Sequence, residues 1–509
     1  MNEINKVLQG IVRGAGIVFA GTIISMLFWF LNAVVVARFF STAEYGVFNL
    51  ALTILNIAFI ITMLGFPSSL PREVAFYREK EPSKIGSLIL TALVIVSLIS
   101  LAVTSFLVFG STYIARIFNE NRLSYALKII SLALPFSALI GTFVAISQGF
   151  GRVRERVYFQ NIAFPLLLFT LIVFGIIVLK VPFIYVFVAY VIAQIITFSI
   201  LVIDTFRLRL FELGSIDLKL GKELIRFSIP LMLTGIAGYV MTWTDTLMLG
   251  YFKTSEVVGL YNAAAPLARI LPIFSNSAGF IYPSLITILY AQEKIEEIKK
   301  VYQVLTKWLF LVTLPLFTTL FLFPEVVIAL FFGSEYLPAS QALRILSLGF
   351  MFHALLGLNW WNLIVIKESK FIMYSTLISA ILNVILNALL IPIYGIEGAA
   401  IATTLSYFVV NILNSLKLYQ KISIHPFSKN YIKSLIISLV LLGLIQNLQL
   451  KVLSVWYAVP ILIVFLIIYL FLILLSRSVD KEDIELILTL EKRTGINLKV
   501  IKKVLKKFI

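Results

Sequence analysis

Long apolar runs are the feature that most constrains this chain, because each is long enough to cross a membrane as a helix. Such a helix needs roughly 20 apolar residues to span about 30 Å of hydrocarbon. Fourteen runs of this kind occur, at residues 14–37, 46–66, 85–109, 124–149, 158–179, 182–203, 223–249, 259–289, 301–323, 341–366, 371–391, 395–416, 431–447 and 454–475. The first is too long for a signal-peptide core and lacks a clear cleavage site, so we expect it to remain as the first helix. The chain is therefore predicted to be an all-α integral membrane protein with about fourteen transmembrane helices.

Bulk composition excludes a soluble enzyme. Hydrophobic residues make up 60% of the 509 residues, charged residues only 13%, and the mean hydropathy is +1.02. Because the chain has no cysteine, disulfides, thiolate metal sites and cysteine nucleophiles are excluded. His353 and His425 are the only histidines, which leaves almost no room for histidine-based metal or triad chemistry. We therefore expect no catalytic site and no enzyme activity.

An internal repeat divides the first twelve apolar runs into two sets of six. Residues Ala126 to Gly141 and Ala342 to Gly357 are identical at nine of sixteen positions, at an offset of 216 residues. Phe39 to Asn49 also matches Phe252 to Asn262 at an offset of 213, with one glycine and one asparagine of each copy in register. Both copies run in the same direction. Many secondary transporters place their substrate site between two duplicated helix bundles of this kind.

Basic residues predict the orientation of the helices. With the N-terminus in the cytoplasm, 33 of the 42 lysines and arginines fall on the inner side and 8 on the outer side, which places both termini in the cytoplasm. The net charge of +17 then faces anionic headgroups, so no nucleic-acid partner is needed to explain it. Residues 496–509 alternate apolar and lysine faces, and we expect an amphipathic basic helix on the cytoplasmic membrane surface.

The loop after the first helix resembles a known family. Val36 to Leu50 (VARFFSTAEYGVFNL), Leu64 to Pro67 (LGFP) and Leu70 to Glu73 (LPRE) are similar to the opening of polysaccharide and O-antigen flippases. These belong to the multidrug/oligosaccharidyl-lipid/polysaccharide (MOP) exporter superfamily, which includes the lipid II flippase. The resemblance implies two six-helix lobes, a C-terminal helix pair, and transfer of an undecaprenyl- or dolichyl-linked oligosaccharide from the inner to the outer leaflet.

On this reading the N-terminal lobe covers residues 1–210, the C-terminal lobe 211–425, the helix pair 426–478, and the basic cytoplasmic tail 479–509. We expect a monomer in the cell (plasma or inner) membrane, whose partners are the lipid-linked oligosaccharide and membrane lipids. Alternating access of the two lobes would move the cargo.

The resemblance also implies that helices 1, 2, 7 and 8 line the cleft between the lobes. The offset of 213 pairs polar residues within these helices, and Trp29 and Trp243 in the same helices are candidates to stack on sugar rings, although an interfacial aromatic belt explains tryptophan equally well. The candidate substrate-binding residues are therefore Arg13, Arg226, Asn32, Asn56, Arg269, Trp29 and Trp243.

Arg269 carries the most specific signal, because it lies about ten residues inside the predicted helix 259–289. A central arginine costs from about 2.5 to above 10 kcal/mol, so it must face water, a ligand or a partner. Pro266 and Pro272 flank it and free backbone groups that only protein or a cavity can satisfy. A guanidinium fork suits the diphosphate that joins sugar to polyprenol. The alternative is a salt bridge to Asp245 that only ties two helices together.

Asp245 is the only acidic residue well within a predicted span, and oxygen-bearing residues are expected at the same depth. Asn383 and Asn387 lie on the eleventh run, and Ala399 and Thr403 on the twelfth. Together these five residues predict an oxygen cage for a monovalent cation, Na⁺ or H⁺, that couples to transport. The constellation resembles the sodium site of the lipid II flippase, except that Asn387 stands where that family has a carboxylate.

Three function classes follow from these residues. A lipid-linked oligosaccharide flippase is favoured, because an anionic, diphosphate-bearing cargo matches the loop signature and the buried arginine. A cation-coupled multidrug exporter of the same superfamily is the alternative, and Asp245 is the single acidic residue that would serve it. A membrane glycosyltransferase would normally show an acidic metal-binding cluster or a large outer domain, and the outer loops are short. No phosphate-binding loop is visible, so an ion gradient, the membrane potential or the lipid gradient must supply the energy.

Overall fold

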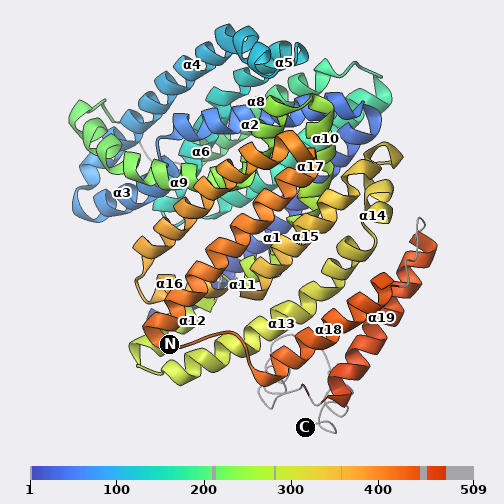
Figure 1. Cartoon of the computed structure of the whole chain (residues 1–509). Helices are drawn as coiled ribbons and strands as arrows, with labels where there is room; N and C mark the ends of the chain where they lie inside the picture. Colours follow the sequence, from blue (N-terminus) through green and yellow to red (C-terminus); the bar gives the residue numbers. More distant parts are fainter. Residues whose placement is uncertain are drawn as a thin grey trace. The chain divides into compact units, whose positions relative to one another are not determined.

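The computed structural model describes residues 3–208, 214–279, 282–356, 358–447, 455–476 and 478. Over these ranges the secondary structure is helical and contains no strand (Figure 1). Eleven helices in the described ranges are long and apolar enough to cross a membrane. The predicted all-α membrane fold is confirmed. The predicted basic helix at 496–509 lies outside the described residues.

The chain divides into two compact units, each assembled from two stretches of sequence. The N-terminal unit comprises Met1–Ala263 and Ala380–Ala402, and the C-terminal unit comprises Ala264–Ser379 and Thr403–Ile509. The lobe boundaries drawn from the repeat, 1–210 and 211–425, remain a prediction.

The N-terminal unit is a helix bundle in which α2, α4 and α6 contact one another and α6 also contacts α8 (Figure 1). Its helices are α1 (Glu3–Phe39), α2 (Thr42–Met63), α3 (Phe66–Lys80), α4 (Ile85–Ile117), α5 (Arg122–Ile130), α6 (Leu134–Gly149), α7 (Phe164–Val173), α8 (Ile184–Arg207) and α9 (Leu218–Phe252). Two π-helical segments, Arg156–Ala163 and Phe174–Val178, flank α7. Parts of α10 (Ser255–Ala268) and α17 (Ser369–Ile422) complete the unit.

The family-like loop motifs set the ends of α2 and α3. Ser41 caps α2 with a capping box, in which its hydroxyl accepts from the Glu44 N–H and the Glu44 carboxylate accepts from the Ser41 N–H. Gly65 has φ 84°, and a Cβ there would lie 2.4 Å from the Ser228 carbonyl oxygen on α9. Only glycine tolerates both the left-handed backbone and this contact. Pro67 then starts α3 in its first turn, where a missing N–H costs nothing.

The repeated glycine and asparagine occupy equivalent places in the two copies. A Cβ on Gly46 would lie 1.7 Å from the Ser255 carbonyl oxygen, and a Cβ on Gly259 would lie 2.1 Å from the Thr42 carbonyl oxygen. The backbones of α2 and α10 therefore touch where the two glycines meet. Asn49 and Asn262 each donate from Nδ2 to the carbonyl four residues earlier, at 2.8 and 2.9 Å.

The predicted single helix at 259–289 is wrong, because the structure breaks it into three pieces. Helix α10 ends at Ala268, α11 covers Ile273–Ala278 and α12 covers Tyr282–Ala291. Pro266 and Pro272 flank the first break, where proline removes hydrogen-bond donors from the helix. The predicted runs 371–391 and 395–416 share the label α17 but are two helices, separated at Gly395, where φ 57° and ψ −126° are not helical.

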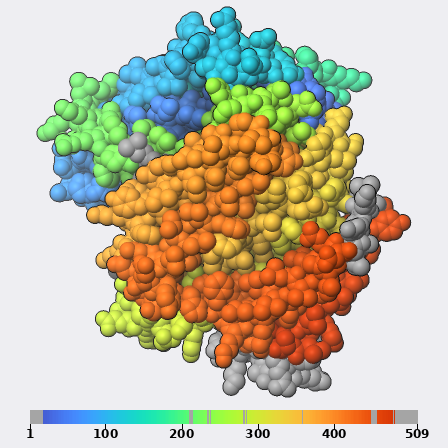
Figure 2. Space-filling model, in the orientation of Figure 1, coloured from blue at the N-terminus to red at the C-terminus, as the bar shows by residue number. Residues whose placement is uncertain are grey.

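The C-terminal unit packs α13 against α15, and α18 and α19 contact each other and α13. Its further helices are α13 (Ile295–Leu322), α14 (Pro324–Phe331), α15 (Ser340–Leu356), α16 (Leu358–Val365), α18 (Lys429–Asn447) and α19 (Val455–Leu475). Figure 2 shows the outer surface of α18 and α19, helices on which large apolar side chains such as Leu439, Leu444 and Ile467 are exposed. Surfaces of this kind face lipid in a membrane protein.

Candidate functional site

Three of the five predicted cation-coupling residues lie together in the N-terminal unit. The side chains of Asp245 on α9 and of Asn383 and Asn387 on α17 are each at most 1% exposed. Asn387 Nδ2 donates to Asp245 Oδ1 at 2.8 Å and to Asn383 Oδ1 at 3.1 Å. The structure therefore brings these three side chains into direct contact, and their depth in the membrane stays a prediction.

Tyr261 on α10 completes the cluster and was missed by sequence reasoning. Its hydroxyl donates to Asp245 Oδ2, and the side chain is only 1% exposed. The signal was available, since Tyr261 is two residues inside the predicted helix 259–289, near its outer end, where Asp245 was also placed.

The remaining two predicted cage residues are placed differently. Ala399 is fully buried on the stretch of α17 that belongs to the N-terminal unit. Thr403 is the first residue of the adjoining stretch in the C-terminal unit. Their participation, and the salt bridge of Asp245 with Arg269 of the C-terminal unit, remain predictions.

The oxygen donors of this cluster fit a monovalent cation. Asn387 Oδ1 is buried and has no hydrogen-bond partner among the described residues. A half-turn of the Asn387 amide exchanges its N–H donors for this oxygen, which then joins the Asp245 carboxylate and Asn383 Oδ1. Carboxylate and amide oxygens are the ligands that hard cations prefer. One side-chain rotation would thus replace the observed hydrogen bonds by a group of oxygens that a cation could bind.

Two of the predicted substrate-binding residues on α1 pack within the N-terminal unit. Asn32 is 1% exposed, and its Nδ2 donates to the Pro165 carbonyl at 3.2 Å. Trp29 meets Phe164 edge to face, with ring centroids 5.9 Å apart. Both therefore hold α1 against the start of α7.

Trp243 on α9 stacks on Tyr239, with centroids 6.0 Å apart and an interplanar angle of 24°. The Tyr239 hydroxyl in turn donates to the Thr53 carbonyl on α2 at 3.0 Å. Because Trp243 is only half-buried, one part of its ring is accessible.

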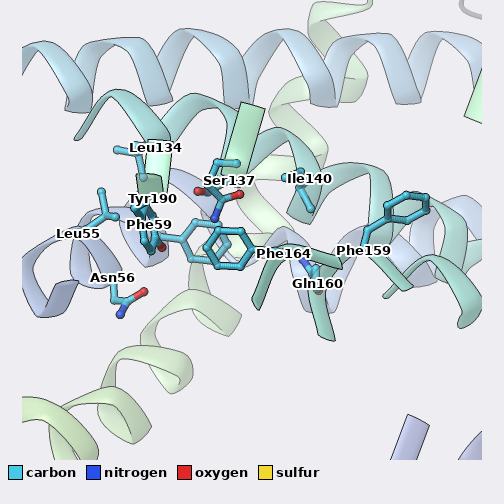
Figure 3. Close-up of a pocket in the computed structure, with 11 residues that line it drawn as sticks. Leu55, Asn56, Phe59, Leu134, Ser137, Ile140, Phe159, Gln160, Phe164 and Tyr190 are labelled. Atoms are coloured by element: carbon cyan, nitrogen blue, oxygen red, sulfur yellow. The ribbon is translucent and has the colours of Figure 1, made fainter. Parts of the chain in front are cut away.

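Asn56 lines a cavity of ≈ 130 Å³ inside the N-terminal unit. Figure 3 shows it at the left of this pocket and Gln160 at the right, with the ring of Phe164 between them in this view. The pocket had no counterpart in the sequence-based expectations, although Asn56 itself was predicted as a binding residue.

The three candidate arginines lie on different elements of the chain. Arg13 lies in α1, and its side chain is outside the described residues. Arg226 on α9 is exposed. Arg269 is half-buried and follows the last residue of α10, so it sits in the non-helical turn before α11.

Comparison with known sequences identifies the family. The sequence model described as "Polysaccharide biosynthesis protein" matches residues 11–289, and the one described as "MatE" matches residues 230–389. A probable low-salt glycan biosynthesis flippase, Agl15, of Haloferax volcanii is 30% identical over 207 residues, which are 40% of this chain and 44% of that protein. The capsular polysaccharide biosynthesis protein CapF of Staphylococcus aureus is 29% identical over 190 residues, 37% of this chain and 48% of the relative. Each of these matches thus covers less than half of the relative's length.

Solved structures show the same fold. The lipid II flippase MurJ in an inward closed conformation superposes with a TM-score of 0.71 at 17% identity, covering 89% of this chain and 98% of that one. An inward-facing multidrug resistance MATE family transporter of the MOP superfamily gives 0.64 at 15% identity, covering 78% and 94%. Since one family model matches more than half of the chain, this multi-pass membrane protein belongs to the polysaccharide biosynthesis protein family.

Proposed function

We propose that this protein moves a polyprenyl-diphosphate-linked oligosaccharide from the cytoplasmic to the outer leaflet by alternating access. The observation that carries the proposal is the position of Arg269 at the break between α10 and α11. Non-helical backbone at membrane depth is tolerated only where protein or a water-filled cavity satisfies it. A guanidinium at such a place presents a planar fork to an anionic group, and a diphosphate accepts bidentate hydrogen bonds from it.

A cation gradient is the proposed energy source. Asp245, Asn383, Asn387 and Tyr261 would hold the cation, with Ala399 and Thr403 as the further predicted ligands. A sodium ion or proton bound there would supply the free energy of its electrochemical gradient. The buried, unpartnered Asn387 Oδ1 supports this assignment, because a native buried polar atom without a hydrogen bond calls for an explanation.

The second candidate function is export of cationic drugs, and the buried Asp245 and the match to the MatE family favour it. A drug-sized cation would need open space beside the carboxylate, whereas Asp245 is only 1% exposed and Asn387 and Tyr261 contact both of its oxygens. The lipid-linked cargo therefore remains the better supported proposal. Agl15 and CapF are named a probable flippase and a polysaccharide biosynthesis protein, and we propose no catalytic step for this chain.

Reconstitution into liposomes tests the proposal. Lipid-linked glycans extracted from the cells in which this protein is native are added to the outer side, and a membrane-impermeant lectin or oxidant reports which leaflet holds the sugar. Protein-dependent movement is expected. Absence of movement, together with efflux of a fluorescent cationic drug, would instead establish the multidrug function.

Arg269 variants link this assay to the site. Arg269→Ala is expected to lower the rate at least about tenfold, and Arg269→Lys to restore only part of it, since a point charge loses the bidentate geometry. Arg207→Ala, at an exposed arginine in the last turn of α8, is the matched control and should leave the rate unchanged. If both Arg269 variants move lipid at the wild-type rate, the diphosphate does not bind there.

A further inference from the structure

The cavity in the N-terminal unit combines neutral polar groups with aromatic rings. Asn56 on α2, Ser137 on α6, Gln160 on the π-helix and Gln194 on α8 line it together with Phe59 and Phe164. None of its lining residues carries a formal charge. A diphosphate or a cationic drug would therefore be poorly stabilised in this pocket, whereas a neutral group with many hydroxyls finds both donors and acceptors.

Three of these polar groups are available to a ligand, whereas Gln194 already hydrogen-bonds the Tyr190 side chain. Among the described residues, no hydrogen bond engages the side-chain amides of Asn56 and Gln160, which are both half-buried. The Ser137 hydroxyl donates to the Ala133 carbonyl at 2.9 Å and keeps its acceptor sites. Each amide offers two N–H donors and one carbonyl oxygen, so the set can pair with several hydroxyls at once.

The size of the pocket matches one ring. Its volume of ≈ 130 Å³ is close to that of an engineered cavity of about 150 Å³ that binds benzene. Phe164 packs edge to face against both Trp29 and Tyr190, with ring centroids 5.9 Å and 5.2 Å away, and these contacts hold its ring in place. A fixed aromatic ring beside free amides is a surface on which the apolar face of a sugar can rest.

Local backbone geometry gives an independent reason to regard this pocket as built for a ligand. Gln160 lies on the π-helix Arg156–Ala163, where the Phe164 N–H bonds to the Phe159 carbonyl five residues earlier. Proline at position 165 has no N–H, which removes one ordinary helical bond just beyond this turn. Asn32 of α1 donates to the Pro165 carbonyl and fastens the segment. Single π-turns within helices occur frequently at functional sites.

We propose that this pocket binds one neutral sugar ring of the transported glycan. The inference rests on the proposed flippase function and deepens it, because two chemically different parts of one cargo are then recognised by different residues. Arg269 takes the diphosphate, which every lipid-linked glycan shares. Asn56, Ser137 and Gln160 form hydrogen bonds with the sugar hydroxyl groups, whose number and placement differ from one glycan to another.

Variants of the pocket test the proposal in the same liposomes. Gln160→Leu and Asn56→Leu remove the amides and keep the size of the side chain, and Ser137→Leu fills the cavity. Ser199→Leu is the matched control, since Ser199 also donates to the carbonyl four residues earlier, at 2.8 Å, but is exposed on α8. Two probes are compared, the native lipid-linked glycan pool and synthetic polyprenyl diphosphate without sugar, and the melting temperature of each purified variant confirms folding.

The three pocket variants are expected to bind and move the glycan pool about tenfold less well, while the affinity for sugar-free polyprenyl diphosphate stays at the wild-type value. Wild-type behaviour of all three on the glycan pool would overturn the sugar site and leave the flippase function standing. Equal losses for both probes in variants that melt like wild type would overturn it too, because the pocket would then not distinguish sugar from diphosphate. A wild-type protein that moves neither probe would instead refute the proposed function itself.

Discussion

At the scale of single residues, the Asn387 amide decides which hydrogen-bonding state the Asp245 cluster adopts. In the structure its N–H group donates hydrogen bonds to Asp245 and Asn383, and so stands where a bound cation would otherwise contact their oxygens. The family resemblance puts a carboxylate at this position, and a second carboxylate beside Asp245 would demand a cation. With asparagine at this position the cluster does not require a cation, because Asn387 can hydrogen-bond to Asp245 and Asn383 when no cation is bound.

If the Asp245 cluster binds the coupling cation as proposed, sodium should stabilise the purified wild-type protein relative to potassium at equal ionic strength. A ligand at 100 times its Kd contributes about 2.7 kcal/mol to the folded state, which raises the melting temperature. Asp245→Asn should abolish the difference between the two salts, and Asn387→Asp should enlarge it. Asn359→Ala, which removes another fully buried asparagine that donates to the Asn411 carbonyl at 3.0 Å, should destabilise the protein and leave the salt difference intact.

The competing role for Asp245 is neutralisation of Arg269, and a double substitution separates the two. If Asp245 serves only that role, Asp245→Asn leaves the half-buried Arg269 uncompensated, and adding Arg269→Gln recovers stability. Such a recovery, with equal melting temperatures in sodium and potassium, would remove the coupling proposal.

At the scale of helices, the contact of α2 with α10 depends on two glycines. Gly46→Ala places a methyl group within 1.7 Å of the Ser255 carbonyl oxygen, so one backbone must move. We expect a loss of about 2 kcal/mol or more in unfolding free energy, measured by thermal or denaturant unfolding. Gly110→Ala in α4, where nothing lies within 4 Å of the added Cβ, should instead be neutral or slightly stabilising, since alanine favours the helix.

The start of α10 is also fastened to the loop between α4 and α5 by Glu120. Burial alone would raise the pKa of this carboxyl, but hydrogen bonds from Arg122 and Ser255 outweigh it and lower the pKa below its ordinary value. A depressed carboxyl pKa stabilises the fold above the unfolded-state value near 4.5 and loses this contribution as the pH falls through the folded-state pKa.

Glu120→Gln should therefore lower the free energy of unfolding by about 1 kcal/mol at neutral pH. This is less than a buried charge-assisted hydrogen bond contributes, because the Arg122 side chain is 38% exposed. The melting temperatures of variant and wild type should converge as the pH falls through the lowered pKa of Glu120. A difference that is constant over the whole pH range would show that the Glu120 charge does not hold α10.

At the scale of the whole molecule, periodicity and length predicted the helices well, because an apolar run of membrane length has few alternatives in lipid. The break at Arg269 was foreshadowed by Pro266 and Pro272, but proline kinks some helices and ends others, so only the structure located it. The sugar pocket could not be predicted. It is lined by residues of α2, α6, α8 and a π-helix, which lie far apart in the sequence. The hydrogen bonds between residues five apart in the π-helix also give no recognisable periodic pattern in the sequence.

Membrane orientation is the remaining property of the whole chain, and the distribution of 33 inner against 8 outer basic residues predicts it. Since the chain contains no cysteine, single cysteines report on it without a background. Ser83→Cys, in the exposed turn after α3, should be protected from an impermeant maleimide in intact cells, and Thr254→Cys, exposed just before α10, should react. Both replacements keep side-chain size, and both cysteines must react once the membrane is permeabilised, which controls for burial. Labelling of Ser83→Cys together with protection of Thr254→Cys in intact cells would reverse the orientation. The cargo would then have to enter from the opposite side of the membrane, against the direction proposed for the flippase.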